Sequence, residues 1–88
     1  PMNLQRVKSS NIEAIGHESE TLLVRFKGGA VYEYEAVPAE VATQLLEAKS
    51  VGSAIAQLVR AKGFKYRRLP AEEAEGHVVL PQLEGPGS

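Results

Sequence analysis

Val31-Tyr32-Glu33-Tyr34-Glu35-Ala36-Val37-Pro38 decides the fold, because a strand pattern and a helix start meet within these eight residues. Successive side chains of a strand point to opposite faces, so the two tyrosines share one face and the two glutamates the other. Pro38 suits the first position of a helix, since it has no N–H to leave unpaired and its φ is preset. The stretch therefore predicts a junction between a sheet and the helices that follow.

The turn before this stretch decides how it pairs with residues 21–27, which alternate as a strand. A two-residue Gly28-Gly29 loop would set the apolar stripe of that strand beside the glutamates. A three-residue loop, residues 27–29, sets Val24 opposite Tyr32 and Leu22 opposite Tyr34. A one-residue slip exchanges the faces, so burial favours the longer loop, with Gly29 in the left-handed conformation.

The flanking segments complete an α+β pattern. Residues 4–10 predict a short edge strand or an extended lead-in, and residues 11–17 predict a strand. Apolar residues at helical spacing predict a helix over residues 39–48. Ser50 is a good N-cap for a second helix, which Gly63 closes as a left-handed cap. Gly52, in the first turn of that helix, permits a close backbone approach.

The last third of the chain is less regular. Residues 64–69 alternate and predict a fourth strand or an extended arm that Pro70 ends. Residues 71–76 are acidic and tolerate a helix. Val78-Val79-Leu80 is an apolar segment suited to a sheet edge, and the chain from Gln82 onward is predicted to be disordered.

We therefore predict one α+β domain. It comprises an antiparallel β-meander of three to four strands, followed by two helices packed on one face. The domain is expected to span residues 1–70, and residues 71–88 to form an acidic C-terminal tail. Eighty-eight residues leave no room for a second core.

Composition excludes several classes of chemistry. The chain has no Cys, which removes disulfides, thiol catalysis and cysteine-ligated metal sites. No apolar run approaches the roughly 20 residues of a membrane span, and no signal segment opens the chain, so we expect a cytoplasmic protein without a membrane partner. The absence of Asp and scarcity of Asn are compatible with a thermophilic source.

Charge is unevenly distributed. All ten Lys and Arg lie at or before Arg68, against seven Glu before Pro70, which leaves the body at +3. The four remaining Glu leave the tail at −4. Such a division is typical of an interaction tail, or of a tail that folds over a basic patch.

A set of short motifs resembles the KTSC domain, a small module named for the C-terminus of some lysyl-tRNA synthetases and also found as a free-standing bacterial protein. The resemblance runs from about Val7 to about Tyr66. The chain departs from the family at His17 and at Ala54-Ile55, where aromatic residues are usual. The resemblance implies an α+β module, for which nucleic-acid binding is suggested from context. The motifs that carry it are Ser9-Ser10 with Ile12, Ile15-Gly16, Leu22 to Phe26, Tyr32-x-Tyr34, Val37-Pro38, Ala48-x-Ser50-x-Gly52 and Arg60.

A basic cluster after the second helix is the main candidate binding site. Cations that alternate with aromatic rings suit single-stranded nucleic acid, because the charges meet the phosphates and the rings stack on bases. The alternative is a solvated helix end and arm, paired with glutamates of the tail. With Phe64 interleaved, the candidate residues are Arg60, Lys62, Lys65, Tyr66, Arg67 and Arg68.

Other candidate sites have weaker support. Tyr32 and Tyr34 suit a base-stacking platform, but the hairpin register turns them toward the helices and makes them core residues. The opposite face then offers Leu23 and Arg25 beside the glutamates, whose carboxylates repel phosphate. Residues 50–53 suit an anion at a helix start, although simple capping explains them. His17, with Glu18 and Glu20, matches no metal-ligand spacing.

The sequence thus predicts a non-enzymatic module with no cofactor, no metal and no catalytic residues. It is expected to bind RNA or another single-stranded nucleic acid through residues 60–68. The alternative is a protein-interaction module, acting through a sheet edge and the C-terminal tail as a homodimer or with another protein. A third reading is a small-ligand or anion site around Ser50 and Tyr34. We treat Tyr32, Tyr34, Pro38, Ser50 and Gly52 as structural motif residues.

Overall fold

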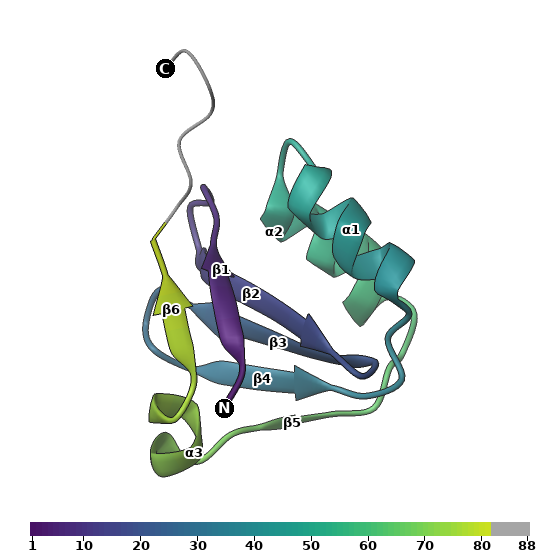
Figure 1. Ribbon diagram of the computed structural model, residues 1–88. Helices are drawn as coiled ribbons and strands as arrows, with labels where there is room; N and C mark the ends of the chain where they lie inside the picture. Colours follow the sequence, from purple (N-terminus) through teal and green to yellow (C-terminus); the bar gives the residue numbers. More distant parts are fainter. Residues whose placement is uncertain (82–88) are drawn as a thin grey trace.

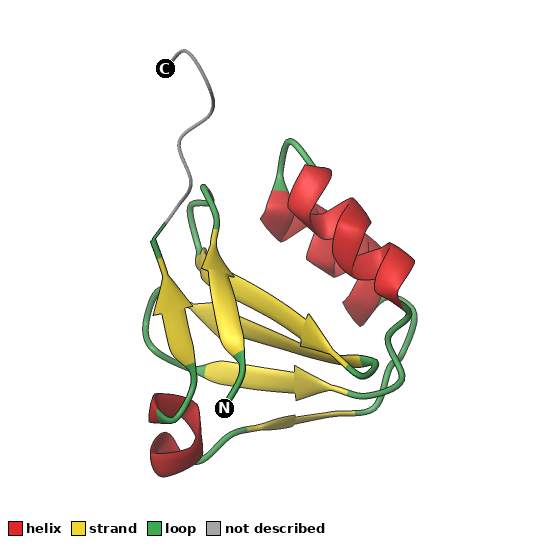
Figure 2. Ribbon diagram, in the orientation of Figure 1, coloured by secondary structure: helices red, strands yellow, loops and turns green. Residues whose placement is uncertain are grey.

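The fold is α+β, as predicted (Figures 1 and 2). The computed structural model describes residues 1–81, so the predicted disordered end lies outside the described residues. In chain order the elements are β1 (Asn3–Arg6), β2 (Ile12–Glu18), β3 (Thr21–Phe26), β4 (Val31–Tyr34), α1 (Ala39–Glu47), α2 (Val51–Ile55), the π-helical turn η1 (Ala56–Arg60), β5 (Tyr66–Arg68), α3 (Ala71–Glu75) and β6 (Val78–Leu80).

A single six-stranded sheet carries the fold, in the order β5-β4-β3-β2-β1-β6. Strands β1 to β4 form the predicted antiparallel meander, and the helices follow it. Residues 66–68, predicted as a strand or an arm, pair with β4 as a strand. The apolar segment at residues 78–80 adds to a sheet edge, as predicted, and runs parallel to β1. Residues 71–80 therefore return to the N-terminal edge of the same sheet.

The β3–β4 hairpin has the predicted three-residue loop. The N–H of Phe26 donates to the carbonyl of Ala30 at 2.8 Å. Leu22 pairs with Tyr34 and Val24 with Tyr32, so the apolar stripe is continuous. Gly29 adopts φ +99°, the left-handed conformation expected of it.

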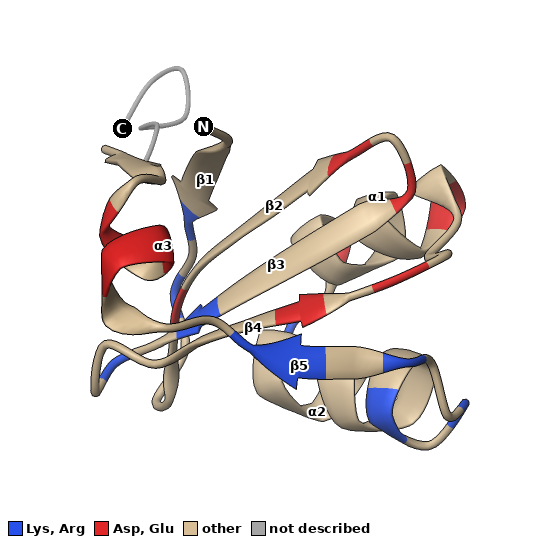
Figure 3. Cartoon of the chain, turned by 90° about the horizontal axis from the view of Figure 1, so that it is seen from below, with Lys and Arg blue, Asp and Glu red and all other residues tan. Residues whose placement is uncertain are grey.

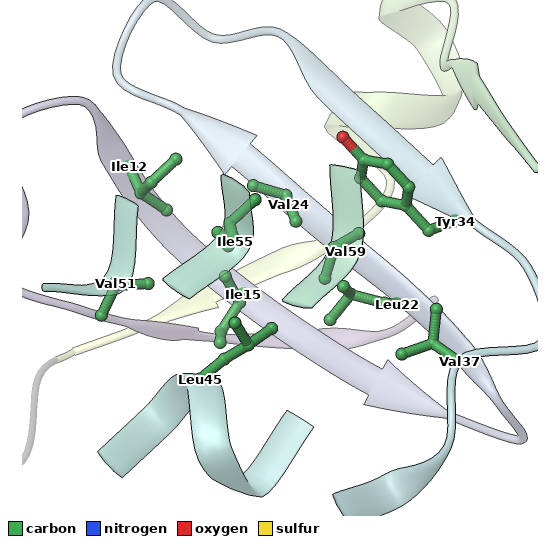
Figure 4. Packing of buried hydrophobic residues seen from close by; sticks show 10 residues of the cluster. All are labelled: Ile12, Ile15, Leu22, Val24, Tyr34, Val37, Leu45, Val51, Ile55 and Val59. Carbon is green, nitrogen blue, oxygen red and sulfur yellow. The ribbon is translucent and has the colours of Figure 1, made fainter. Parts of the chain in front are cut away.

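The main core lies between the sheet and the helix layer (Figure 4). Leu45 of α1 and Ile55 of α2 are almost fully buried against Ile15 and Val24 of the sheet. Pro38 is the N-cap of α1, with ψ 151°, rather than its first helical residue, and α1 starts at Ala39, within the predicted range of residues 39–48. Ser50 caps α2 as predicted, since its hydroxyl accepts from the N–H of Ser53 at 3.2 Å.

A second apolar cluster packs on the opposite face of the sheet, which corrects the expectation of a single core. Leu23, predicted to lie on an open face, is 1% exposed. In Figure 1, β1 and β6 cross β2 to β4 at a steep angle, and α3 closes the end of this layer. The cluster comprises Met2, Leu4, Ala14, Leu23, Val31, Leu69 and Ala74.

Gly16 is what lets β1 approach so closely. A Cβ on this residue would lie 2.6 Å from Cδ2 of Leu4 and 2.8 Å from the carbonyl oxygen of Asn3. Real Cβ atoms do not approach a backbone oxygen so closely, so only glycine fits without a shift of β1. The Ile15-Gly16 motif thus has a packing role.

Candidate functional site

One hollow collects every aromatic residue of the chain. It has a volume of about 620 Å³ and lies where β4 and β5 extend beside the end of the second helix. We call it the aromatic groove. It is lined by Phe26, Tyr32, Tyr34, Phe64 and Tyr66, together with Arg60.

Four of the rings in the groove form a series of aromatic pairs. Phe26 meets Tyr32 edge to face, with ring centroids 5.6 Å apart and planes at 83°. The ring centroid of Tyr66 lies 6.1 Å from that of Tyr32 and 5.6 Å from that of Tyr34. These separations are typical of favourable aromatic pairs. Tyr34 is 5% exposed and Tyr66 is 61% exposed, so the groove has a fixed floor and an open aromatic rim.

Strand pairing explains why these rings converge. Tyr66 is opposite Tyr34 in the β4–β5 ladder, and paired residues of neighbouring strands share a face. A further backbone bond, from the N–H of Glu35 to the carbonyl of Lys65 at 2.9 Å, extends that ladder toward the helix. Figure 4 shows Tyr34 reaching from β4 toward Val59 in the helix layer, where η1 ends at Arg60.

The positive charge of Arg60 acts on the phenol of Tyr34, which forms the floor of the groove. Burial raises the pKa of the Tyr34 phenol above its ordinary value, and the positive charge of Arg60 opposes that rise. Tyr32 and Tyr66 add smaller contributions that raise it. The groove therefore combines stacking surface, phenol groups and one guanidinium.

Arg67 lies on the other face of the sheet, because it pairs with Glu33 rather than with a tyrosine. Its Nε lies 3.1 Å from Oε1 of Glu33, and its Nη2 lies 3.0 Å from Oε1 of Glu73 in α3. These hydrogen bonds raise the pKa of Arg67 and lower the pKa of Glu73. Figure 3 shows the blue segment of β5 beside the red segment of β4, with the red α3 beyond its end.

The predicted basic cluster is thus divided by the sheet. Arg67 is held by carboxylates, and Lys65 lies 3.9 Å from Glu35 while remaining 88% exposed. Arg68 pairs with Tyr32, which puts it on the face of the aromatic groove. Among residues 1–81, Arg60, Lys62 and Arg68 make no ion pair, and all three are exposed. The predicted pairing with an acidic tail segment is therefore found for Arg67.

The Ser50 and Gly52 motif packs against the N-terminal turn. A Cβ on Gly52 would lie 2.9 Å from Oδ1 of Asn11, and the hydroxyl of Ser9 accepts from the N–H of Ile12 at 3.2 Å. Ser50 and Tyr34 line separate hollows, so they do not form the small-ligand site considered from the sequence.

The two histidines have structural neighbours. Nε2 of His17 lies 2.6 Å from the carbonyl oxygen of Val37, and Nδ1 of His77 accepts from the N–H of Met2 at 2.9 Å. Within residues 1–81, no three His, Cys, Asp or Glu side chains are grouped so as to hold a metal ion. No helix in that range is long and apolar enough to cross a membrane.

Sequence reasoning assigned the groove residues to two different roles. Tyr32 and Tyr34 were predicted to be core residues, and Arg60 and Tyr66 to belong to a binding arm. The structure brings all four together, with Phe26 and Phe64. Treating residues 64–69 as a strand paired with β4, rather than as an arm, would have revealed the groove.

Comparison with known proteins identifies relatives along most of the chain. The family model for the KTSC domain matches residues 8–64 of this chain. An uncharacterised protein of Stutzerimonas stutzeri is 40% identical over 65 residues, covering 72% of this chain and 92% of that protein. A protein of Tsukamurella paurometabola is 44% identical over 59 residues, covering 65% of this chain and 88% of its own.

The crystal structure of a KTSC domain protein from Yersinia pestis is also similar, with a TM-score of 0.71 at 29% identity. The match covers 80% of this chain and 100% of that one. The region matched by the domain model ends at Phe64, so Tyr66 and the segments β5, α3 and β6 lie beyond it.

Proposed function

The chain belongs to the KTSC domain family, and from this premise we propose that it is a non-enzymatic module that binds single-stranded nucleic acid, RNA above all. The observation that carries the proposal is the convergence of all five aromatic residues and Arg60 on one groove. We also retain, as predictions from composition, a cytoplasmic location and a thermophilic source.

The chemistry of the groove supports this choice over an enzymatic one. Proteins bind unpaired bases by stacking them on aromatic side chains, and they meet the phosphates with Arg and Lys. Tyr66 offers an exposed ring at the rim, and Arg60 lines the same groove as the buried Tyr34, where its charge opposes the rise in the pKa of the phenol. A groove of about 620 Å³ has the size of a small-ligand site, which suits a base with its sugar.

The proposed site differs from the basic cluster predicted from the sequence. Arg60, Lys62 and Arg68 are retained as candidates, because they are exposed and their charges are unpaired among the described residues. Tyr66 is retained as an exposed ring at the rim of the groove. Arg67 is removed from the site, since two carboxylates already hold it. Lys65 contributes only long-range charge.

The test is binding of fluorescently labelled single-stranded RNA, followed by anisotropy at low salt. Replacing Tyr66 by Ala removes one stacking surface, which is worth about 1–3 kcal/mol per base, so affinity should fall about 5- to 150-fold. Val78→Ala is the matched control, since Val78 is an apolar residue, 50% exposed, on the opposite edge of the sheet. Absence of binding by the wild-type protein at low salt would overturn the proposal.

A pair of arginine variants separates the two faces of β5. Arg60→Gln should weaken binding and reduce the dependence of affinity on salt, because one phosphate contact is lost. Arg67→Gln should leave affinity nearly unchanged, because its charge is already neutralised by Glu33 and Glu73. Equal losses in the two variants would point to nonspecific attraction rather than to the groove.

The alternative, a protein-interaction module, has one specific observation in its favour. The sheet ends in two short strands, β5 and β6, each paired on one side only among the described residues. Such edges accept an added strand from a second molecule. Light scattering that shows a stable dimer, lost when Val79 is replaced by Pro, would favour this alternative.

A further inference from the structure

A second hollow adjoins the aromatic groove. It has a volume of about 560 Å³ and lies at the β3–β4 turn, beside the chain that leads from β5 into α3. We call it the arginine hollow, because Arg25 and Arg68 line it with Gly28 and Gly29. Ala30 lines both hollows, so they meet at this small residue.

The two arginines of the hollow are presented differently. Arg68 is exposed and pairs in register with Tyr32, so its backbone stands directly beside the aromatic groove. Nε of Arg25 is fixed by Oε1 of Glu13 at 2.9 Å, and its Nη2 lies 4.0 Å from the place of a Cβ on Gly29. Gly28 and Gly29 at the turn carry no side chain that would fill the hollow.

The balance of charge in the hollow favours an anion. Within residues 1–81, Glu75 is the only carboxylate that lines it, against two arginines. Arg25 shares its charge with Glu13, so Arg68 supplies most of the unpaired positive charge. Guanidinium groups bind phosphate by charge-assisted hydrogen bonds, which are stronger than neutral ones.

From this placement we infer that the arginine hollow receives the phosphodiester next to the base stacked in the aromatic groove. The ligand of the two hollows is therefore a base joined to a phosphodiester, as in a linked chain of nucleotides, and not a free nucleoside. The inference rests on the proposed function and deepens it. The rings of the aromatic groove hold the base, and Arg68 positions the sugar-phosphate backbone of the nucleic acid, which continues past Ala30.

The inference is tested by competition against a labelled RNA hexamer. The competitors are the nucleoside uridine, which has no phosphate, the dinucleotide UpU, which has one, and the trinucleotide UpUpU. In the wild-type protein, affinity should rise about ten- to hundredfold from uridine to UpU, as expected for charge-assisted bonds to one phosphate. Arg68→Gln should abolish most of that rise and leave the affinity for uridine unchanged.

Two control variants sharpen the result. Glu75→Gln removes the one carboxylate that residues 1–81 contribute to the hollow, so it should strengthen binding of UpU but not of uridine. Arg67→Gln, on the face opposite the aromatic groove, should leave the affinity for both ligands unchanged. Near-ultraviolet circular dichroism of each variant confirms that the tyrosine environment is intact.

The outcomes distinguish this inference from the proposed function. Equal affinities for uridine and UpU would overturn the inference while the stacking role of the groove stands. Equal losses for both ligands in Arg68→Gln would overturn it as well, because Arg68 would then act on the base site itself. Failure of every competitor and of the hexamer to bind would overturn both.

Discussion

Replacing Gly16 by Ala tests the close approach of β1 to β2, on which the second apolar cluster depends. The added Cβ would lie 2.6 Å from Cδ2 of Leu4 and 2.8 Å from the backbone oxygen of Asn3. A methyl group at the end of a leucine can turn aside, but a carbonyl in the β1 ladder cannot move without the strand. The variant therefore has to displace β1, which also carries β6.

The magnitude follows from two opposing effects. Overpacking a well-packed site costs about 1–3 kcal/mol of unfolding free energy. Alanine regains about 0.5–1 kcal/mol, because glycine loses more backbone freedom on folding. The midpoints of these two ranges leave a net loss of stability of about 1 kcal/mol. For a domain of this size, Tm changes by about 4–8 °C per kcal/mol, so the midpoint should fall by about 4–8 °C.

Thermal unfolding followed by circular dichroism measures this loss, with urea unfolding as a second estimate. Gly28→Ala is the matched control, because nothing lies within 4 Å of the added Cβ and the residue sits in an exposed turn. Its Tm should stay close to that of the wild-type protein. A Gly16→Ala variant as stable as Gly28→Ala would refute the account of β1 packing.

Three further predictions follow from the same structure. Arg60→Gln should raise the pKa of Tyr34 further, because the charge of Arg60 opposes the rise caused by burial; absorbance of tyrosinate during alkaline titration measures it. Since the folded-state pKa of Tyr34 is raised, its contribution to stability is present below the pKa of an unfolded tyrosine and is lost as pH rises through the folded value. The pKa of Glu73 is lowered by Arg67, so its contribution is present above the pKa of an unfolded glutamate and is lost as pH falls through the folded value. Thermal melts across the acid range should show a weaker pH dependence in Glu73→Gln. Gly52→Ala should be nearly neutral in urea unfolding, since the displaced side chain is an exposed amide and alanine is the better helix former by about 1 kcal/mol.

Local patterns predicted the framework of this fold well. Alternation along residues 21–34 and the need to bury one stripe selected the hairpin register, which is the register observed. Ser50 caps the second helix as predicted. Gly63 adopts the predicted left-handed conformation, but the C-cap is Ala61, two residues earlier. The last helical turn widens into η1, where the N–H of Ala61 donates to the carbonyl of Ala56 at 2.9 Å. No cap, turn residue or periodicity in the sequence predicted this widening.

The sequence determined the strands within residues 11–34 and the two helices that follow them, because period, caps and turn residues act over a few positions. It also determined that Tyr32 and Tyr34 share a face. Only the tertiary structure decided what else lies on that face. The pairing of β5 with β4 joins residues more than thirty positions apart, and it brings Tyr66 to the tyrosines while turning Arg67 to Glu33. The candidate site exists because of that long-range pairing, which no local pattern specifies.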